Sequence, residues 1–156
     1  MKTLKLIVFA LFAIFVTTSL ALSAAYKFEA KLTGKDETPM AVKTTARGEA
    51  DFKLSKDGKE IEYILKVKDI ENATAAHIHM GKKGEEGAPV VGLFKGPKEG
   101  KFSGVLAKGT ITADKLVGPL AGKTIADLDK MIKDGDAYVN VHTTKVPSGE
   151  IRGQVE

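Results

Sequence analysis

The sequence has 156 residues, with 24 basic and 20 acidic side chains, a formal net charge of +4 and no cysteine. This length suits a single domain. The lack of cysteine excludes disulfides, thiolate metal ligands and cysteine nucleophiles. The nearly balanced charge argues against nucleic acid as a partner, because binding it requires a concentrated basic face.

The first 25 residues have the pattern of an export signal. Lys2 and Lys5 give a positive start, residues 6–16 are uninterrupted apolar sequence, and Ser-Ala-Ala at residues 23–25 gives a small-residue end. The alternative is an uncleaved membrane anchor, since a span needs roughly 17–25 residues. Threonines and a serine interrupt the apolar stretch, so we expect a signal peptide over 1–25 and no membrane span after its cleavage. The mature protein, residues 26–156, would be secreted or periplasmic.

Alternation of apolar and polar residues dominates the mature sequence and predicts strands. An Asp57-Gly58 turn is expected to join the second and third strands in a hairpin, and residues 96–100 are expected to turn the chain between the fifth and sixth. The expected strands cover residues 26–33, 46–54, 61–67, 75–80, 89–94, 102–111, 137–143 and 150–155.

One segment has helical periodicity instead. Thr124 is a predicted N-cap with Asp127 three residues later, and Gly135 is a predicted stop. The sequence therefore predicts an all-β fold, an antiparallel β-sandwich of immunoglobulin-like or barrel-like form, with one short helix near 124–134.

The three histidines of the sequence form the main candidate site. His77 and His79 are two residues apart on a predicted strand, so both rings point to the same face, and His142 ends another predicted strand. If these two strands pair, three imidazoles meet, and three nitrogen ligands with an open position suit copper or zinc. A hydrogen-bonded polar cluster without metal is the alternative interpretation.

Other polar residues are candidates for supporting this site, namely Glu37, Tyr138, Asn140, Glu150 and Arg152. A metal-bound histidine needs its second ring nitrogen fixed by a partner. Asn140, Tyr138 or Glu150 are candidates for that role. Glu150 and Arg152 share one strand face, where we expect a surface or cross-strand ion pair. The alternative is that they support the position of His142.

Two further motifs carry less weight. The loop at residues 81–87 has glycine at every third position, but it lacks the end of a P-loop and the dinucleotide fingerprint, so we interpret it as a flexible turn. Asn72-Ala73-Thr74 fits the sequon for N-glycosylation.

Three segments in order resemble the chordin-type (CHRD) domain. Residues 76–81 (AHIHMG), followed by a glycine-rich loop and then residues 88–91 (APVV), resemble its central motif. Residues 137–143 (AYVNVHT) and 147–155 (PSGEIRGQV) resemble its closing motif, and Glu37 before Pro39 resembles its opening. Met80 and the two lysines after Gly81 depart mildly from the pattern. The resemblance implies a β-sandwich in a small exported protein without an assigned reaction.

Three functions are compatible with these features. We favour an exported protein that holds copper or zinc through the histidines for metal handling outside the membrane, with binding that weakens below about pH 6.5 as imidazole is protonated. The alternative is a cell-surface module that binds a protein or glycan and in which the histidines are structural. An enzyme is the least favoured, because no motif supplies a catalytic residue.

Overall fold

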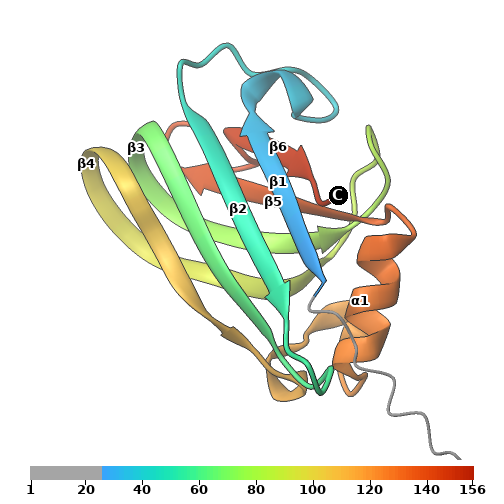
Figure 1. The fold of residues 1–156 in the computed structure, drawn as a ribbon. Helices are drawn as coiled ribbons and strands as arrows, with labels where there is room; N and C mark the ends of the chain where they lie inside the picture. The colour runs from blue at the N-terminus through green and yellow to red at the C-terminus, as the bar shows by residue number, and fades with distance from the viewer. Residues whose placement is uncertain (1–25) are drawn as a thin grey trace, which may run out of the picture.

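The computed structural model describes residues 26–156 as one antiparallel sheet that closes on itself, with a single α-helix beside it (Figure 1). The predicted signal peptide, residues 1–25, lies outside the described residues. None of the described helices is long and apolar enough to cross a membrane. The elements are β1 (Lys27–Thr33), η1 (Gly34–Asp36), β2 (Arg47–Leu54), β3 (Ile61–Met80), β4 (Pro89–Ile111), η2 (Ala113–Lys115), η3 (Gly118–Leu120), α1 (Ile125–Lys133), β5 (Ala137–Thr143) and β6 (Ile151–Gln154).

The sheet forms a closed five-stranded barrel with a sixth strand outside it. The strand order is β2-β1-β6-β5-β3-β4, and β2 also pairs with β3. β1, β2, β3, β5 and β6 therefore make a ring, while β4 lies along the outer edge of β3. β6 closes the ring on β1, where Thr33 pairs with Arg152 and the backbones of Glu29 and Glu156 exchange hydrogen bonds of 2.8 and 2.9 Å. The antiparallel all-β prediction is confirmed, in its barrel-like form.

Two of the predicted strand boundaries are wrong, because β3 and β4 are each one long strand rather than two short ones. β3 has 20 residues and β4 has 23, and they pair along almost their whole length. The ribbon bends where Asp69 and Asn72 take positive φ angles of 57° and 51° and the register shifts. The first half of β3 can thus pair with β2 and its second half with β5. Residues 96–100, the predicted turn, lie within β4.

The hairpin and the helix agree with the sequence prediction. β2 and β3 pair across the predicted turn, where Gly58 has a φ of 69°. Thr124 caps α1 by accepting the backbone N–H of Asp127, whose carboxylate accepts the N–H of Thr124 in return. The apolar face of α1 belongs to the same buried core as the inward side chains of the strands; it consists of Ile125, Leu128, Met131 and Ile132.

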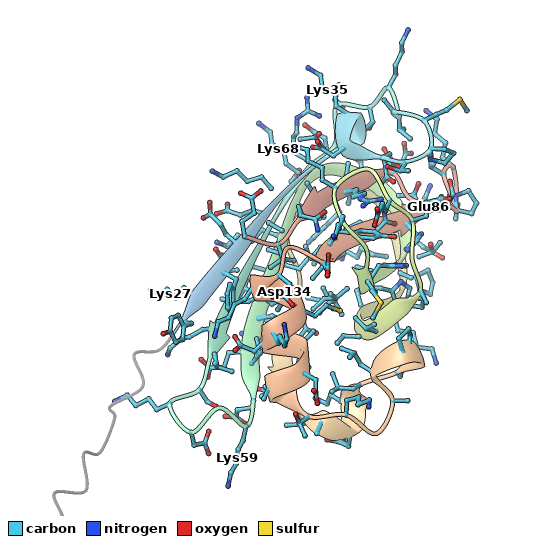
Figure 2. All side chains as sticks on the ribbon, turned by 90° about the vertical axis from the view of Figure 1, so that its right-hand side faces the viewer. Lys27, Lys35, Lys59, Lys68, Glu86 and Asp134 are labelled. Carbon is cyan, nitrogen blue, oxygen red and sulfur yellow. The ribbon has the colours of Figure 1, made fainter. Side chains whose placement is uncertain are left out.

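The loop between β3 and β4 lies at the same end of the barrel as η1. Figure 2 shows Lys35 of η1 and Glu86 of the loop between β3 and β4 toward one end of the molecule, and Lys59 of the β2–β3 hairpin at the opposite end. The Glu86 loop and the segment after β5 supply the backbone groups that contact the histidines, as described below.

Candidate functional site

The structure brings the three histidines together on the outer face of the barrel. Ile78, which lies between His77 and His79 in β3, is fully buried in the core, so both rings point outward. β5 pairs with this half of β3, with Ala75 opposite His142 and His77 opposite Asn140. The pairing on which the candidate site depends is therefore present, and all three rings are partly buried.

The ring nitrogens converge closely enough to surround one ion. One nitrogen from each histidine lies within 4.8 Å of the other two, and among the described residues no carboxylate completes a larger group with them. His77 Nδ1 is 3.2 Å from His142 Nε2. Two nitrogens that each lie about 2.0–2.1 Å from a tetrahedral zinc ion are roughly 3.3 Å apart, so this pair already has the separation that a shared ion requires.

Backbone carbonyls fix two of the rings. His79 Nδ1 donates to the Gly87 carbonyl and His142 Nδ1 donates to the Pro147 carbonyl, both at 2.9 Å. A carbonyl only accepts, so each Nδ1 carries the proton and each Nε2 keeps a free lone pair. His79 Nε2 is buried without a hydrogen-bond partner. Such outer hydrogen bonds are typical of histidines that hold a metal.

Main-chain oxygens, rather than the candidate side chains of Asn140, Tyr138 and Glu150, accept hydrogen bonds from the second ring nitrogens of His79 and His142. The glycine-rich loop in the sequence was a signal for one of these oxygens, the Gly87 carbonyl. A Cβ atom at Gly87 would lie 1.7 Å from the Met80 carbonyl oxygen, so only glycine allows this approach of the loop to β3. The loop interpreted as a flexible turn thus supplies the acceptor for His79.

Burial lowers the pKa of all three histidines. Desolvation is the largest cause in each case. It brings the pKa of His77 down to about 4, with further contributions from the charges that His142 and His79 would carry. The rings are therefore neutral, and able to act as ligands, at a lower pH than ordinary imidazole.

Tyr138 and Arg152 pack beside His79. The Tyr138 ring stacks on the His79 ring with centroids 5.0 Å apart and an interplanar angle of 13°, and its hydroxyl accepts the Gly87 N–H. The Arg152 guanidinium carbon lies 3.4 Å from the centre of the Tyr138 ring, and the group donates to the Lys82 carbonyl. These contacts hold His79 and its loop in position.

Glu37 and Asn140 form a second buried contact near the histidines. Asn140 Nδ2 donates to both carboxylate oxygens of Glu37, at 2.8 and 3.0 Å, and both side chains are more than 90% buried. Desolvation raises the pKa of Glu37 to about 7, although the Asn140 hydrogen bond and the Arg152 charge oppose the rise. Asn140 Oδ1 is buried and has no partner.

Glu150 supports the loops rather than a histidine. Its carboxylate accepts hydrogen bonds from the hydroxyls of Thr44 and Thr143, both at 2.7 Å. Glu150 and Arg152 are both buried, and neither takes part in an ion pair within residues 26–156, so the expected ion pair between them is not observed.

The raised pKa of Glu37 predicts a pH dependence of folding. The folded state binds its proton more tightly than the unfolded chain, so this stabilisation is complete below about pH 4.5 and is lost as the pH rises through about 7. Between pH 5 and pH 8, the metal-free wild type should lose roughly 2–3 kcal/mol of unfolding free energy relative to Glu37→Gln. Urea unfolding at both pH values measures this difference. The exposed Glu71→Gln is the control, and a constant gap between wild type and Glu37→Gln would contradict the assignment.

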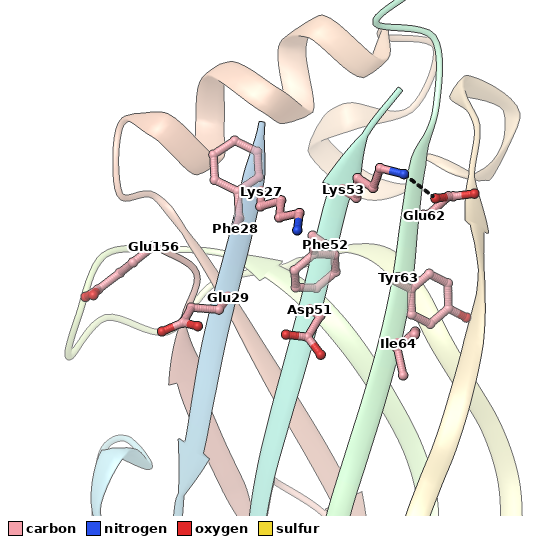
Figure 3. A pocket seen from close by; sticks show the side chains of 10 residues that line it. All are labelled: Lys27, Phe28, Glu29, Asp51, Phe52, Lys53, Glu62, Tyr63, Ile64 and Glu156. Carbon is pink, nitrogen blue, oxygen red and sulfur yellow. Dashed lines mark ion pairs between the residues drawn. The ribbon is translucent and has the colours of Figure 1, made fainter. Parts of the chain in front are cut away.

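A separate cavity of about 470 Å³ lies over β1, β2 and β3 (Figure 3). Lysines and acids of neighbouring strands line it together with Phe28, Phe52, Tyr63 and Ile64. Lys53 pairs with Glu62 across 3.6 Å. No histidine lines this cavity and its ion pair is exposed, so we assign no chemistry to it.

The described chain is thus a closed antiparallel β-barrel with a three-histidine cluster on its outer face, covered by loops. It belongs to the CHRD domain family, whose model matches residues 28–155. The match covers nearly all of the described residues and confirms the resemblance found in the motifs. Comparisons with curated proteins and with solved structures find no match.

Proposed function

We propose that this CHRD-domain protein binds one transition-metal ion, copper or zinc, through His77, His79 and His142. The observation that carries the proposal is the convergence of three imidazoles, two of which have the second nitrogen fixed by a carbonyl. Three neutral nitrogen ligands suit zinc and copper better than magnesium or calcium, which prefer oxygen. The family match supports a small β domain and does not itself name a ligand.

The export signal expected at residues 1–25 indicates where this metal would be handled. A protein cleaved there acts outside the cytoplasmic membrane, as a secreted or periplasmic protein that stores, delivers or buffers the ion. The lowered histidine pKa values support binding in mildly acidic surroundings. Protons compete with the metal for the imidazole nitrogens, and a lowered pKa means that this competition begins at a lower pH than for ordinary imidazole. The pH at which binding weakens is therefore lower than the 6.5 expected from the sequence.

A structural role for the histidines is the second candidate function. In the absence of metal, His77 Nδ1–H can donate to the free Nε2 of His142 across 3.2 Å. In this case the cluster stabilises the loops, and the protein acts as a cell-surface module for a protein or glycan partner.

Isothermal titration of the metal-stripped protein, residues 26–156, with zinc and copper(II) distinguishes the two functions. We expect one-to-one binding in the wild type and its loss in His77→Ala/His79→Ala. Circular dichroism and urea unfolding establish that the variant is folded. A folded wild type that binds neither ion would refute the metal site and leave the structural role.

A further inference from the structure

An open hollow of about 510 Å³ lies where η1 and the loop after it meet the start of β2. Three of its lining residues are basic and none is acidic; the lining consists of Gly34, Lys35, Ala41, Val42, Lys43, Thr44, Thr45 and Arg47. The hollow therefore combines small and apolar side chains with positive charge and supplies no carboxylate of its own.

The positive charges around this hollow are not neutralised within the described part of the chain. Lys35, Lys43 and Arg47 form no ion pair there. Arg47 Nη1 donates to the carbonyls of Thr44 and Ala46, at 3.2 and 2.7 Å, which holds the guanidinium beside the loop but leaves its charge in place. Three uncompensated cations around one hollow favour an anionic partner.

A fourth cation, Lys68 of β3, lies directly opposite Arg47 in the pairing of β2 with β3. Lys68 also forms no ion pair in the described residues, and Figure 2 shows it toward the same end of the molecule as Lys35. Like charges directly opposite each other destabilise a sheet, and a bound anion would offset this repulsion.

The acids near these cations do not cancel their charge. Asp36 is exposed but is a single carboxylate beside four cations, and it accepts a hydrogen bond from the Thr33 hydroxyl at 2.6 Å. Glu37 is buried and accepts the hydrogen bonds of Asn140. The loop between β3 and β4 at this end carries two lysines and two glutamates, so its own charge is balanced. This end of the barrel therefore remains positive.

The loop after η1 also has an exposed apolar tip. Met40 is 79% exposed, the highest value among the exposed large hydrophobic side chains of the described residues, and its neighbours Pro39 and Ala41 are exposed as well. Apolar surface of this kind gains free energy when it leaves water. An apolar tip beside lysines and an arginine is typical of proteins that lie on an anionic bilayer.

We propose that this end of the barrel docks on the surface of an anionic phospholipid bilayer through a patch made of Lys35, Met40, Lys43, Arg47 and Lys68. The four cations contact the headgroup phosphates, and Met40 enters the boundary between headgroups and acyl chains. The exposed methionine favours a bilayer over a soluble anion, which would need only the cations. Docking requires no metal ion, so this inference does not depend on the proposed function.

Co-sedimentation with lipid vesicles tests the proposal. Residues 26–156 form the whole barrel and are used without the preceding apolar segment, which would itself bind lipid. Vesicles of phosphatidylcholine alone are compared with vesicles in which about a third of the lipid is anionic phosphatidylglycerol. We expect the wild type to bind only the anionic vesicles. Lys35→Gln/Lys43→Gln should bind them about 25-fold more weakly, because each basic residue near the surface contributes about fivefold.

Lys56→Gln/Lys59→Gln is the matched control for the charge. It removes two exposed lysines from the β2–β3 hairpin, and Figure 2 shows Lys59 at the end opposite Lys35. The two double variants therefore have the same net charge and differ in where the charge is lost. The control should stay within about twofold of wild type, because its lysines lie far from the lipid. Equal weakening in both double variants would overturn the proposal, since the overall charge alone would then explain binding.

Met40→Ser tests the apolar part of the patch. We expect it to bind anionic vesicles several-fold more weakly than wild type, because less apolar surface enters the bilayer. Val117→Ser is its control, since Val117 is 45% exposed and lies outside the patch. Circular dichroism establishes that each variant is folded. A folded wild type that does not bind anionic vesicles would overturn the proposal. Wild-type affinity in Met40→Ser would also overturn it, because a soluble anion or an acidic protein would then be the partner of the cations.

Discussion

Alanine in place of His142 is expected to weaken zinc binding at least about a hundredfold, equivalent to roughly 2.7 kcal/mol. The variant removes one of three nitrogens that lie within 4.8 Å of one another, and the remaining pair is on a single strand. Two imidazoles with solvent in the other positions hold zinc much less firmly than three. Isothermal titration of the metal-stripped protein measures the change.

Thr144→Ala is the matched control for this prediction. Thr144 is exposed and lies two residues after His142, just past the end of β5, so its loss tests for a general disturbance of the loop that follows. His142 is only partly buried, and water can bind the Pro147 carbonyl after its removal, so we expect His142→Ala to fold. Equal zinc affinity in His142→Ala and Thr144→Ala would show that His142 is not a ligand.

Alanine in place of Gly153 is expected to destabilise the barrel by about 3 kcal/mol or more, because the closure between β6 and β1 has no room for a side chain. A Cβ atom there would lie 2.3 Å from the Lys31 carbonyl oxygen and 2.7 Å from its carbonyl carbon. Both are backbone atoms, so the strands must separate, and overpacking of this kind costs typically 1–3 kcal/mol and sometimes more. Urea unfolding with circular dichroism measures the loss.

Gly92→Ala in β4 is the control for the Gly153 variant. It is also a glycine in a strand, but a Cβ atom there would have no neighbour within 4 Å. We expect its unfolding free energy to stay within about 0.5 kcal/mol of wild type. If the two alanine variants are equally stable, the tight closure at Gly153 does not limit the fold.

The local elements of this protein follow from its sequence because the signals that specify them are local. Alternation in β1 and β5, the Asp57-Gly58 turn, and the Thr124 capping box each depend on residues a few positions apart. The same locality places His77 and His79 on one face of a strand, and the motifs around them identify the family.

The connections between distant elements required the tertiary structure. The sequence divides β3 and β4 into short strands, because polar and glycine residues at the bend resemble turns, whereas cross-strand pairing carries both strands through it. Only this bend lets β3 pair with both β2 and β5, which closes the barrel and brings His142 to His77.

The immediate partners of the histidines were also decided by the fold. The sequence favours side chains such as Asn140 for this role, but the carbonyls of Gly87 and Pro147 take it. Every residue has a backbone carbonyl, so composition carries no signal for which one will face a ring. The sequence by itself thus determined the strands, the helix and the family, while loop packing against the barrel determined the tautomers and the burial of the histidines.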